Sequence, residues 1–535
     1  MARDKKTDKA RLGSGLSVSS RSSGNDAFER ALSVFEGSLC RLDLHSGEVT
    51  TLVSQKGRGF KLIDLLSDGE HLVCIVGGDI EIVNVRTGER RTVCTDLTLP
   101  CLVKVTGDSI QVASPTTTGV RFGEVSDGVL GGVQDVTIPG FDIQPHSWTD
   151  DGELLFVSST KGVSNILYSV NTTTGNVEQL TEDEKVVFSY NHRCGVHTLH
   201  TRTSIIFPYS SLNAATELWM WEDCGKKQLK KVSTFNEELV AERMPTSHVI
   251  NYPSGEFSIE AILVLPPDYS SDKAFPTLVY VHGGPETHVN ASFTELISAR
   301  AESAAIHLAN QGYVVLLPNC RGSDGYGAEF ESEIGSYQVM NKPYQDIMCG
   351  IDYLVEQGIT DASLLGIYGS SYGAQVTAWT VSHTSRFGAA VCAVGVHYDA
   401  LFVDRYHGDS FLTYRDTRKG NAEKVDIWTK PELMRQISPI EHVASVETPM
   451  LLVETSGERT DDYSYAQPYF NGLTKMGKEA YLVYYPEAFH NGGWNDEYKK
   501  DYMQRLVCWF DYCLKGFQLP EWFIAPTNSL PTKDT

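Results

Sequence analysis

The feature that most constrains this sequence is the pentapeptide Gly-Ser-Ser-Tyr-Gly at 369–373, which has the pattern G-x-S-x-G. An apolar run at 364–368 precedes it, and a stretch typical of a helix follows at 374–379. Together they predict a sharp strand–turn–helix in which the flanking residues must be small and the serine stands above the sheet, at the positive end of a helix. Only Ser371 has glycine two residues away on each side; Ser370 has tyrosines there. Ser371 is therefore the candidate nucleophile.

A glycine-rich loop upstream supplies candidate donors for a developing oxyanion. A buried-strand run at 277–281 ends in His-Gly-Gly-Pro at 282–285. Glycine lets backbone N–H groups approach an oxygen without obstruction by side chains. In α/β-hydrolases the second donor is the backbone N–H of the residue after the nucleophile, here Tyr372. An ordinary Gly-Pro loop is the alternative, but this loop lies one strand–helix–strand unit before the pentapeptide, which favours the functional interpretation.

The order serine, acid, histidine of the α/β-hydrolase fold predicts where the other two catalytic groups lie. His490 follows a strand run at 481–485 and precedes a closing helix at about 496–514, so it is the candidate general base among 15 histidines. The acid is expected after the strand at 450–453. Loop position favours Glu458, and the nearby carboxylates remain open as alternatives: Glu454, Asp461 and Asp462.

Several blocks in the C-terminal half, over about 249–515, resemble the prolyl oligopeptidase family of serine peptidases, particularly its acylaminoacyl-peptidase and dipeptidyl-peptidase-like branch. In order they are HGGP at 282–285, NCRGSDGYG at 319–327, Asp346 before a helix, GSSYG at 369–373, SPIEHVASVETPMLLV at 438–453 and YPEAFH at 485–490. The resemblance implies Ser371 as nucleophile, His490 as base, and Gly284 with Tyr372 as oxyanion donors. Arg321 and Tyr326 match the family's RGS-x-GYG loop near the active site, which makes Arg321 a candidate substrate-binding residue.

The acid loop departs from this resemblance. The family usually has strand-H-G-x-x-D, whereas this chain has Glu454 and Thr455 in place of the histidine and glycine. Glu458 falls at the aspartate position, 32 residues before His490. Glutamate replaces aspartate in some triads of this fold.

The implied chemistry is acyl transfer. His490 takes the proton of Ser371 as it attacks a carbonyl, the acid holds the imidazole, and water later hydrolyses the acyl-enzyme. This chemistry needs no metal and no organic cofactor. The sequence also has no H-E-x-x-H, Walker A or dinucleotide-binding pattern.

The N-terminal half is expected to be a β-propeller. Residues 1–25 are polar and predict a disordered tail, and 26–240 consist of short β-prone runs. Glycines of hairpin-type turns recur at 47, 88, 128, 175 and 225, in steps of 41, 40, 47 and 50, and a second series lies at 69, 107 and 152. This is the period of a four-stranded propeller blade and allows about five blades. A propeller this short leaves closure by a second copy of the chain, and hence a homo-oligomer, as an open alternative. A doubly wound, mostly parallel α/β-hydrolase is expected over 241–518, with a tail at 519–535.

Charge and cysteine content bound the partners. With 45 basic and 68 acidic residues the net charge is −23, which disfavours nucleic-acid or anionic-membrane binding. Neither a secretory signal nor an apolar run of membrane-spanning length is apparent. The 11 cysteines are odd in number and scattered, so free thiols in the cytoplasm are expected.

Three functions stay open at this stage. The first is a serine peptidase acting on short or N-blocked peptides. The second is a hydrolase of the same chemistry acting on an ester, lactone or amide of a small metabolite. The third is a non-catalytic protein whose propeller binds a partner, which the intact Ser371, His490 and HGGP disfavour.

Overall fold

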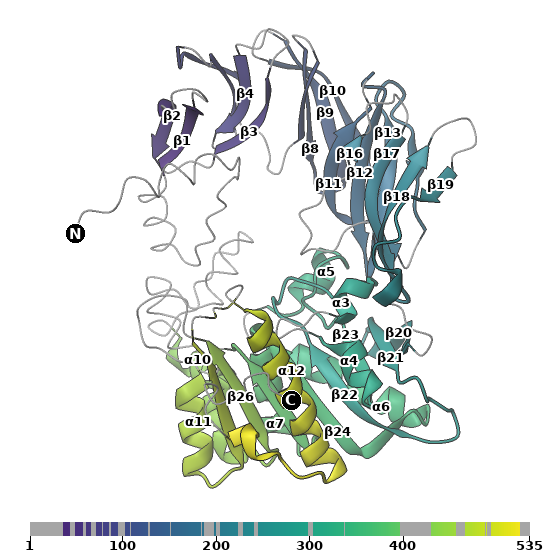
Figure 1. Ribbon diagram of the computed structural model, residues 1–535, viewed down its shortest axis with the longest axis vertical. Helices are drawn as coiled ribbons and strands as arrows, with labels where there is room; N and C mark the ends of the chain where they lie inside the picture. The colour runs from purple at the N-terminus through teal and green to yellow at the C-terminus, as the bar shows by residue number, and fades with distance from the viewer. Residues whose placement is uncertain are drawn as a thin grey trace, which may run out of the picture.

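The computed structural model describes residues 36–524, except 43–48, 57–59, 66–70, 77–78, 85–86, 95–101, 107–108, 127–128, 150, 183–184, 187–196, 199–203, 223–227, 240–243, 298–302, 336–337, 396–429, 456–465, 487, 489 and 491–493. A β-rich part precedes an α/β part along the chain (Figure 1). None of the described helices is long and apolar enough to cross a membrane.

The β-rich part consists of antiparallel sheets joined in sequence. β1 and β2 pair; β3 to β6 form one four-stranded sheet in chain order, and β7 to β10 form a second; β11 to β19 form a nine-stranded sheet. The strands are β1 (Glu36–Leu42), β2 (Val49–Lys56), β3 (Phe60–Leu65), β4 (His71–Val76), β5 (Asp79–Asn84), β6 (Arg90–Cys94), β7 (Leu102–Thr106), β8 (Ser109–Pro115), β9 (Gly119–Ser126), β10 (Val129–Thr137), β11 (Phe141–Trp148), β12 (Leu154–Lys161), β13 (Ser164–Asn171), β14 (Val177–Gln179), β15 (Lys185–Val186), β16 (His197–Thr198), β17 (Ser204–Ser211), β18 (Ala214–Glu222) and β19 (Gln228–Lys231).

Three of the expected hairpin turns fall on described residues, and each joins two paired strands. Gly88 lies between β5 and β6, Gly152 between β11 and β12, and Gly175 between β13 and β14. Their φ angles are 76°, 76° and 73°, a left-handed conformation that glycine adopts without steric cost. The other expected turns, with glycines at 47, 69, 107, 128 and 225, lie outside the described residues.

The α/β part is built on an eight-stranded sheet in the order β20-β21-β23-β22-β24-β25-β26-β27. The strands from β22 to β27 pair in parallel, and β20 and β21 pair antiparallel at one edge. The expected mostly parallel sheet is therefore present. The strands are β20 (Thr246–Ser254), β21 (Phe257–Leu265), β22 (Phe275–Val281), β23 (Val314–Pro318), β24 (Thr360–Ser370), β25 (Ala389–Ala393), β26 (Met450–Thr455) and β27 (Ala480–Tyr485).

Helices cover both faces of this sheet, as its fully buried central strands require. One buried cluster joins the sheet to α6, α7 and α11, and a second joins it to α4 and α12. The helices, including short 3₁₀ turns, are η1 (Glu237–Leu239), α3 (Phe293–Ile297), α4 (Ala305–Asn310), α5 (Ala328–Ser332), α6 (Asn341–Glu356), α7 (Tyr372–His383), α10 (Pro431–Ile437), η3 (Pro439–Ser445), α11 (Ala466–Lys475), α12 (Asp496–Lys515) and η4 (Glu521–Ile524).

Two hairpin tips of the β-rich part are embedded in the α/β part. Val163, between β12 and β13, is 1% exposed and belongs to the same buried cluster as α4 and α12. Its carbonyl accepts a hydrogen bond from the Ala291 N–H at 2.8 Å, and the Gly162 N–H donates to the Gly325 carbonyl at 2.9 Å. Leu212, between β17 and β18, is buried in this cluster too. The two parts therefore share a core at this contact.

A buried ion pair fastens the segment after β23, which carries the NCRGSDGYG block. Nη2 of Arg321 lies 2.6 Å from Oδ1 of Asp346, and the Arg321 backbone N–H donates to Oδ2 at 2.7 Å. The two side chains are 4% and 0% exposed. Asp346 lies inside α6, which begins at Asn341, so the expectation that it precedes a helix is wrong. Its place in the second turn aims the carboxylate at the Arg321 loop.

Replacing Arg321 by methionine is expected to lower the free energy of unfolding by about 3–5 kcal/mol, because the buried Asp346 carboxylate loses its partner. Urea denaturation measures this. The control is Arg386→Met, which breaks a pair of the same 2.6 Å length whose side chains are 33% and 59% exposed. That control is expected to cost about 0–1 kcal/mol. Equal losses in the two variants would contradict a structural role for Arg321.

At the contact between the two parts, Asp142 of β11 comes near Asp324 and Glu331. Desolvation there, together with these two carboxylates, raises the pKa of Asp142 to about 6, although His288 acts in the opposite direction. The carboxyl of an aspartate ordinarily has a pKa of about 4. Stability that depends on protonated Asp142 is therefore lost as the pH rises from about 4 to about 6.

Asp142→Asn is expected to raise the thermal midpoint at pH 7.5, with the gain shrinking as the pH falls towards about 4. Scanning calorimetry across this range checks the trend. Asp135→Asn is the matched control, and its thermal midpoint is expected to change in the opposite direction. The reason is that a hydrogen bond from Arg121 lowers the pKa of Asp135. A gain for Asp142→Asn that does not depend on pH would contradict the electrostatic explanation.

Candidate active site

Ser371 occupies the turn between β24 and α7. Its φ of 59° and ψ of −124° lie outside the regions that non-glycine residues usually adopt. The Ser371 backbone N–H donates to the Ala393 carbonyl at the end of β25, at 2.9 Å. Such strain persists only where surrounding contacts determine the conformation. The strand–turn–helix predicted around Ser371 is thus present, with the serine in a strained turn.

The two glycines that flank this turn are required by contact with β22. A Cβ on Gly369 would lie 2.6 Å from the Val281 carbonyl oxygen, and a Cβ on Gly373 would lie 2.0 Å from the same atom. Both distances are far below ordinary van der Waals contact. Small residues on either side of Ser371 are therefore a steric requirement, as the pentapeptide predicts.

His490, after β27, faces the serine. Its Nε2 lies 2.9 Å from Oγ of Ser371, within the distance at which a general base can take the hydroxyl proton. The two residues are 119 positions apart in the chain. The parallel sheet brings the two residues together, because the carboxyl ends of β24 and β27 lie at the same end of the sheet. This geometry can activate Ser371 as a nucleophile.

Of the four carboxylates considered for the acid, only Glu454 lies within the described residues; Glu458, Asp461 and Asp462 lie outside them. Glu454 is 3% exposed and is the residue before the last of β26. Its carboxylate accepts hydrogen bonds from the Thr455 N–H at 3.0 Å and from the Ala466 N–H, at the start of α11, at 2.9 Å. Glu454 therefore ties together the two ends of the segment that contains the other three.

The His-Gly-Gly-Pro loop passes directly beside the nucleophile. A Cβ on Gly283 would lie 3.4 Å from Cβ of Ser371. Gly284 has a φ of 128°, which strongly favours glycine, and a Cβ there would lie 2.7 Å from the Glu286 nitrogen. Tyr372, the other expected donor, is the first residue of α7, and such N–H groups have no acceptor within their helix. The loop and the helix terminus thus flank Ser371.

The Tyr372 side chain and His282 support this arrangement. The Tyr372 hydroxyl donates to the Val339 carbonyl, which holds the buried ring in the core. His282 is buried, which lowers its pKa and favours the neutral ring. Its Nδ1 lies 2.7 Å from the Gly283 carbonyl oxygen and its Nε2 lies 2.9 Å from Oγ of Ser323. A neutral ring can satisfy both contacts, one as donor and the other as acceptor.

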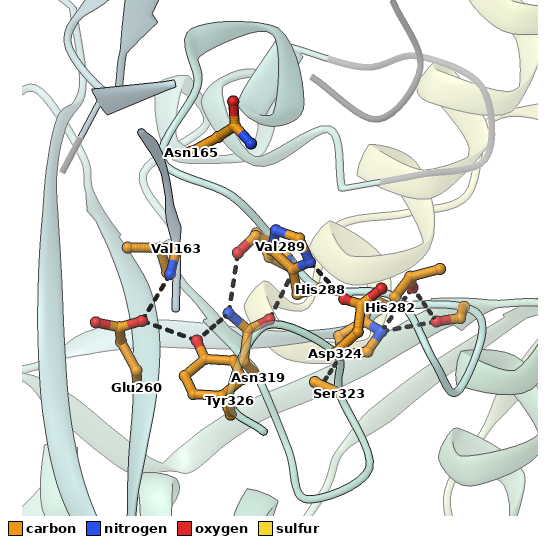
Figure 2. A network of polar contacts seen from close by, with 12 residues as sticks. Val163, Asn165, Glu260, His282, His288, Val289, Asn319, Ser323, Asp324 and Tyr326 are labelled. Atoms are coloured by element: carbon orange, nitrogen blue, oxygen red, sulfur yellow. Dashed lines mark hydrogen bonds and ion pairs between the residues drawn. The ribbon is translucent and has the colours of Figure 1, made fainter. Parts of the chain in front are cut away.

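The segment 319–327 holds the His-Gly-Gly-Pro loop from the side (Figure 2). The Asn319 amide accepts from the Val289 N–H at 2.7 Å and donates to the Val289 carbonyl at 2.9 Å. It also donates to the Tyr326 hydroxyl, which in turn donates to Glu260 at 2.8 Å. The Glu260 carboxylate also accepts from the Val163 N–H of the β-rich part, at 2.8 Å. One network therefore reaches from the hairpin tip to this loop.

The substrate-binding role expected for Arg321 stays a prediction, and its contacts in the structure are with neighbouring side chains. Its guanidinium contacts Asp346, Ser254 and Gln345 through hydrogen bonds, and lies 3.6 Å from Glu333. With its side chain only 4% exposed, Arg321 braces the segment 319–327 through these contacts. Sequence reasoning also missed Asn319, Asp324 and Glu260. The NCRGSDGYG block marked the first two as part of a motif, but nothing in the pattern indicated their partners.

Metal ligands do not gather at this site: within the described residues, no three His, Cys, Asp or Glu side chains lie together as a metal site would require. The chemistry that the described side chains support is the serine–histidine kind.

Comparison with known proteins finds a family match over part of the chain and several distant relatives. Residues 300–517 match the model of the prolyl oligopeptidase family. The chain is 28% identical over 373 residues to the uncharacterized peptidase YuxL of Bacillus subtilis, covering 69% of this chain and 51% of that protein. It is 24% identical over 389 residues to acylamino-acid-releasing enzyme 1 of Oryza sativa subsp. japonica, covering 67% and 47%. The chain thus spans about half the length of these relatives.

Solved structures show the same fold. The acylaminoacyl peptidase of Pyrococcus horikoshii superposes with a TM-score of 0.61 at 15% identity, covering 90% of this chain and 86% of that one. A puromycin hydrolase superposes with a TM-score of 0.63 at 16% identity, covering 89% and 73%. The family match over 300–517, the relatives and the shared fold agree with the motif order, so this part of the chain is similar to the prolyl oligopeptidase family.

Proposed function

We propose that this protein is a serine hydrolase that cleaves peptide or acyl-amide bonds of small substrates through an acyl-enzyme. The observation that carries this proposal is the 2.9 Å contact between His490 Nε2 and Ser371 Oγ at a strained turn beside a glycine loop. His490 takes the Ser371 proton as Oγ attacks the carbonyl carbon, then returns it to the leaving amine. Water, deprotonated by His490, hydrolyses the ester that remains.

The backbone N–H groups of Gly284 and Tyr372 are proposed to stabilise the oxyanion of the tetrahedral intermediate. Two features support this: a Cβ on Gly283 would be in contact with Cβ of Ser371, and Tyr372 begins α7. Donors preorganised in this way bind the charge more strongly as it develops, without reorganisation during the reaction. Glu458 is proposed as the acid that orients His490, from its place between β26 and α11. The hydrogen bonds of Glu454 to two backbone N–H groups favour a supporting role for that residue.

A peptide substrate is favoured over an ester or lactone because the named relatives include an acylamino-acid-releasing enzyme. The β-rich part is proposed to be a propeller of about five blades over 26–240, followed by the hydrolase over 241–518. Two consecutive four-stranded antiparallel sheets support the repeat. Six cysteines are free thiols within the described part of the chain, in keeping with a reducing compartment such as the cytoplasm.

Ser371→Ala is expected to abolish both turnover and labelling by a fluorophosphonate probe, with the thermal midpoint little changed. The measurement combines mass spectrometry of the labelled peptide with parallel assays of acyl-aminoacyl amides, dipeptidyl amides and short acyl esters. Ser370→Ala is the matched control and should keep the label. Turnover that survives in Ser371→Ala would refute the proposal. Turnover of esters alone would assign the ester or lactone alternative, and no turnover with intact folding would favour a binding protein.

Single substitutions to the amide are expected to identify the acid. Glu458→Gln should lower kcat by about 10⁴-fold with KM little changed, as loss of the orienting acid does in such triads. Asp461→Asn and Asp462→Asn serve as matched controls with near wild-type kcat. A larger loss in either control than in Glu458→Gln would transfer the role to that residue.

A further inference from the structure

The loop between β22 and α3, residues 282–292, carries the proposed oxyanion donor Gly284 and lies beside Ser371. Its two glycines have no Cβ to restrict them, so their backbone is intrinsically the most mobile part of such a loop. An oxyanion donor is effective only if its N–H is held where the charge develops. Contacts made elsewhere along the loop must therefore hold the Gly284 N–H in place.

The segment 319–327 contacts this loop at three points (Figure 2). Ser323 binds His282, just before the glycines. Asn319 binds both backbone groups of Val289. Between these two contacts along the loop, Nδ1 of His288 lies 2.5 Å from Oδ1 of Asp324. Figure 2 shows Asp324 next to both histidines.

The His288–Asp324 contact is distinct among these three. It joins two ionisable side chains, only 11% and 19% exposed, and hydrogen bonds of this charge-assisted kind are roughly twice as strong as neutral ones. Asp324 occupies the position that the RGS-x-GYG pattern leaves unspecified. Asp142 of the β-rich part also interacts with both partners, repelling Asp324 and attracting His288.

We propose that His288 and Asp324 form a positioning pair for the active site, which holds the loop 282–292 so that the Gly284 N–H stays where the oxyanion develops. Neither side chain touches the reacting atoms; they act through the backbone between Gly284 and His288. The inference rests on the proposed function. Because the other two contacts remain when the pair is broken, the loss should appear in the chemical step and not in folding.

The experiment measures labelling of Ser371 by a fluorophosphonate probe in the full chain, separating the maximal rate from probe affinity. His288→Gln and Asp324→Asn are each expected to lower the maximal labelling rate, and kcat for any amide or ester turned over, by about 10–100-fold. Probe affinity and KM should change by less than about threefold. The double variant should lose about as much as either single variant. Asp324→Glu, which keeps the acceptor charge, should recover part of the rate.

The matched control is Asp352→Asn, which breaks the exposed ion pair with Arg386 and should leave the labelling rate unchanged. Labelling rates within about twofold of wild type in both single variants, or losses that multiply in the double variant, would overturn the proposal. If Asp324→Asn does not fold, His288→Gln alone decides. Labelling at Ser371 without turnover of any amide or ester would refute the proposed function but still test the pair. A wild-type chain that is not labelled would overturn both.

Discussion

The site depends on one close contact. The carbonyl oxygen of Val281 packs against Gly369 and Gly373, the two glycines that flank Ser371. Any Cβ at Gly373 would lie 2.0 Å from that oxygen, so the strained turn can form only where the chain has no side chain. The next residue after Val281 is His282, which begins the His-Gly-Gly-Pro loop. The close packing that allows the strained serine therefore also brings the oxyanion loop to it.

The segment 319–327 links this site to the β-rich part. A Cβ on Gly325 would lie 2.6 Å from Cγ2 of Thr160, and one on Gly327 would lie 2.9 Å from the ring of Phe141. These glycines are thus the places where β11 and β12 come close to the α/β part. The ion pair between Arg321 and Asp346 fixes the same segment to α6, so the segment contacts the β-rich part, α6 and the loop beside Ser371. The segment therefore connects the two parts of the chain, and a buried Arg321 is consistent with this structural role.

Much of the α/β part could be predicted from local pattern. Apolar runs at 277–281, 450–453 and 481–485 became β22, β26 and β27, because strands of a parallel sheet are buried on both faces and are apolar along their length. The turns at Gly88, Gly152 and Gly175 could also be predicted from local sequence, because their positive φ angles favour glycine.

The roles of charged residues were harder to predict. Arg321 and Glu454 look like functional residues in sequence, one in a motif and one in the acid loop. In the folded chain Arg321 pairs with Asp346, 25 residues away, and Glu454 binds the N–H of Ala466, 12 residues away. A carboxylate or guanidinium next to a motif can contact either a substrate or the backbone, and the sequence pattern is the same in both cases.

The sequence by itself determined the strand–turn–helix at Ser371 and the choice between two adjacent serines, because these depend on steric rules that act within a few residues. It also predicted the order of nucleophile and base, from the chain order of catalytic groups in this fold. Only the tertiary structure decided that His490 reaches Ser371 across 119 residues, that Asp324 pairs with His288, and that Val163 enters the core of the other part. Those contacts depend on how strands are ordered in the sheet and on how two parts of the chain pack. Neither leaves a trace in local sequence.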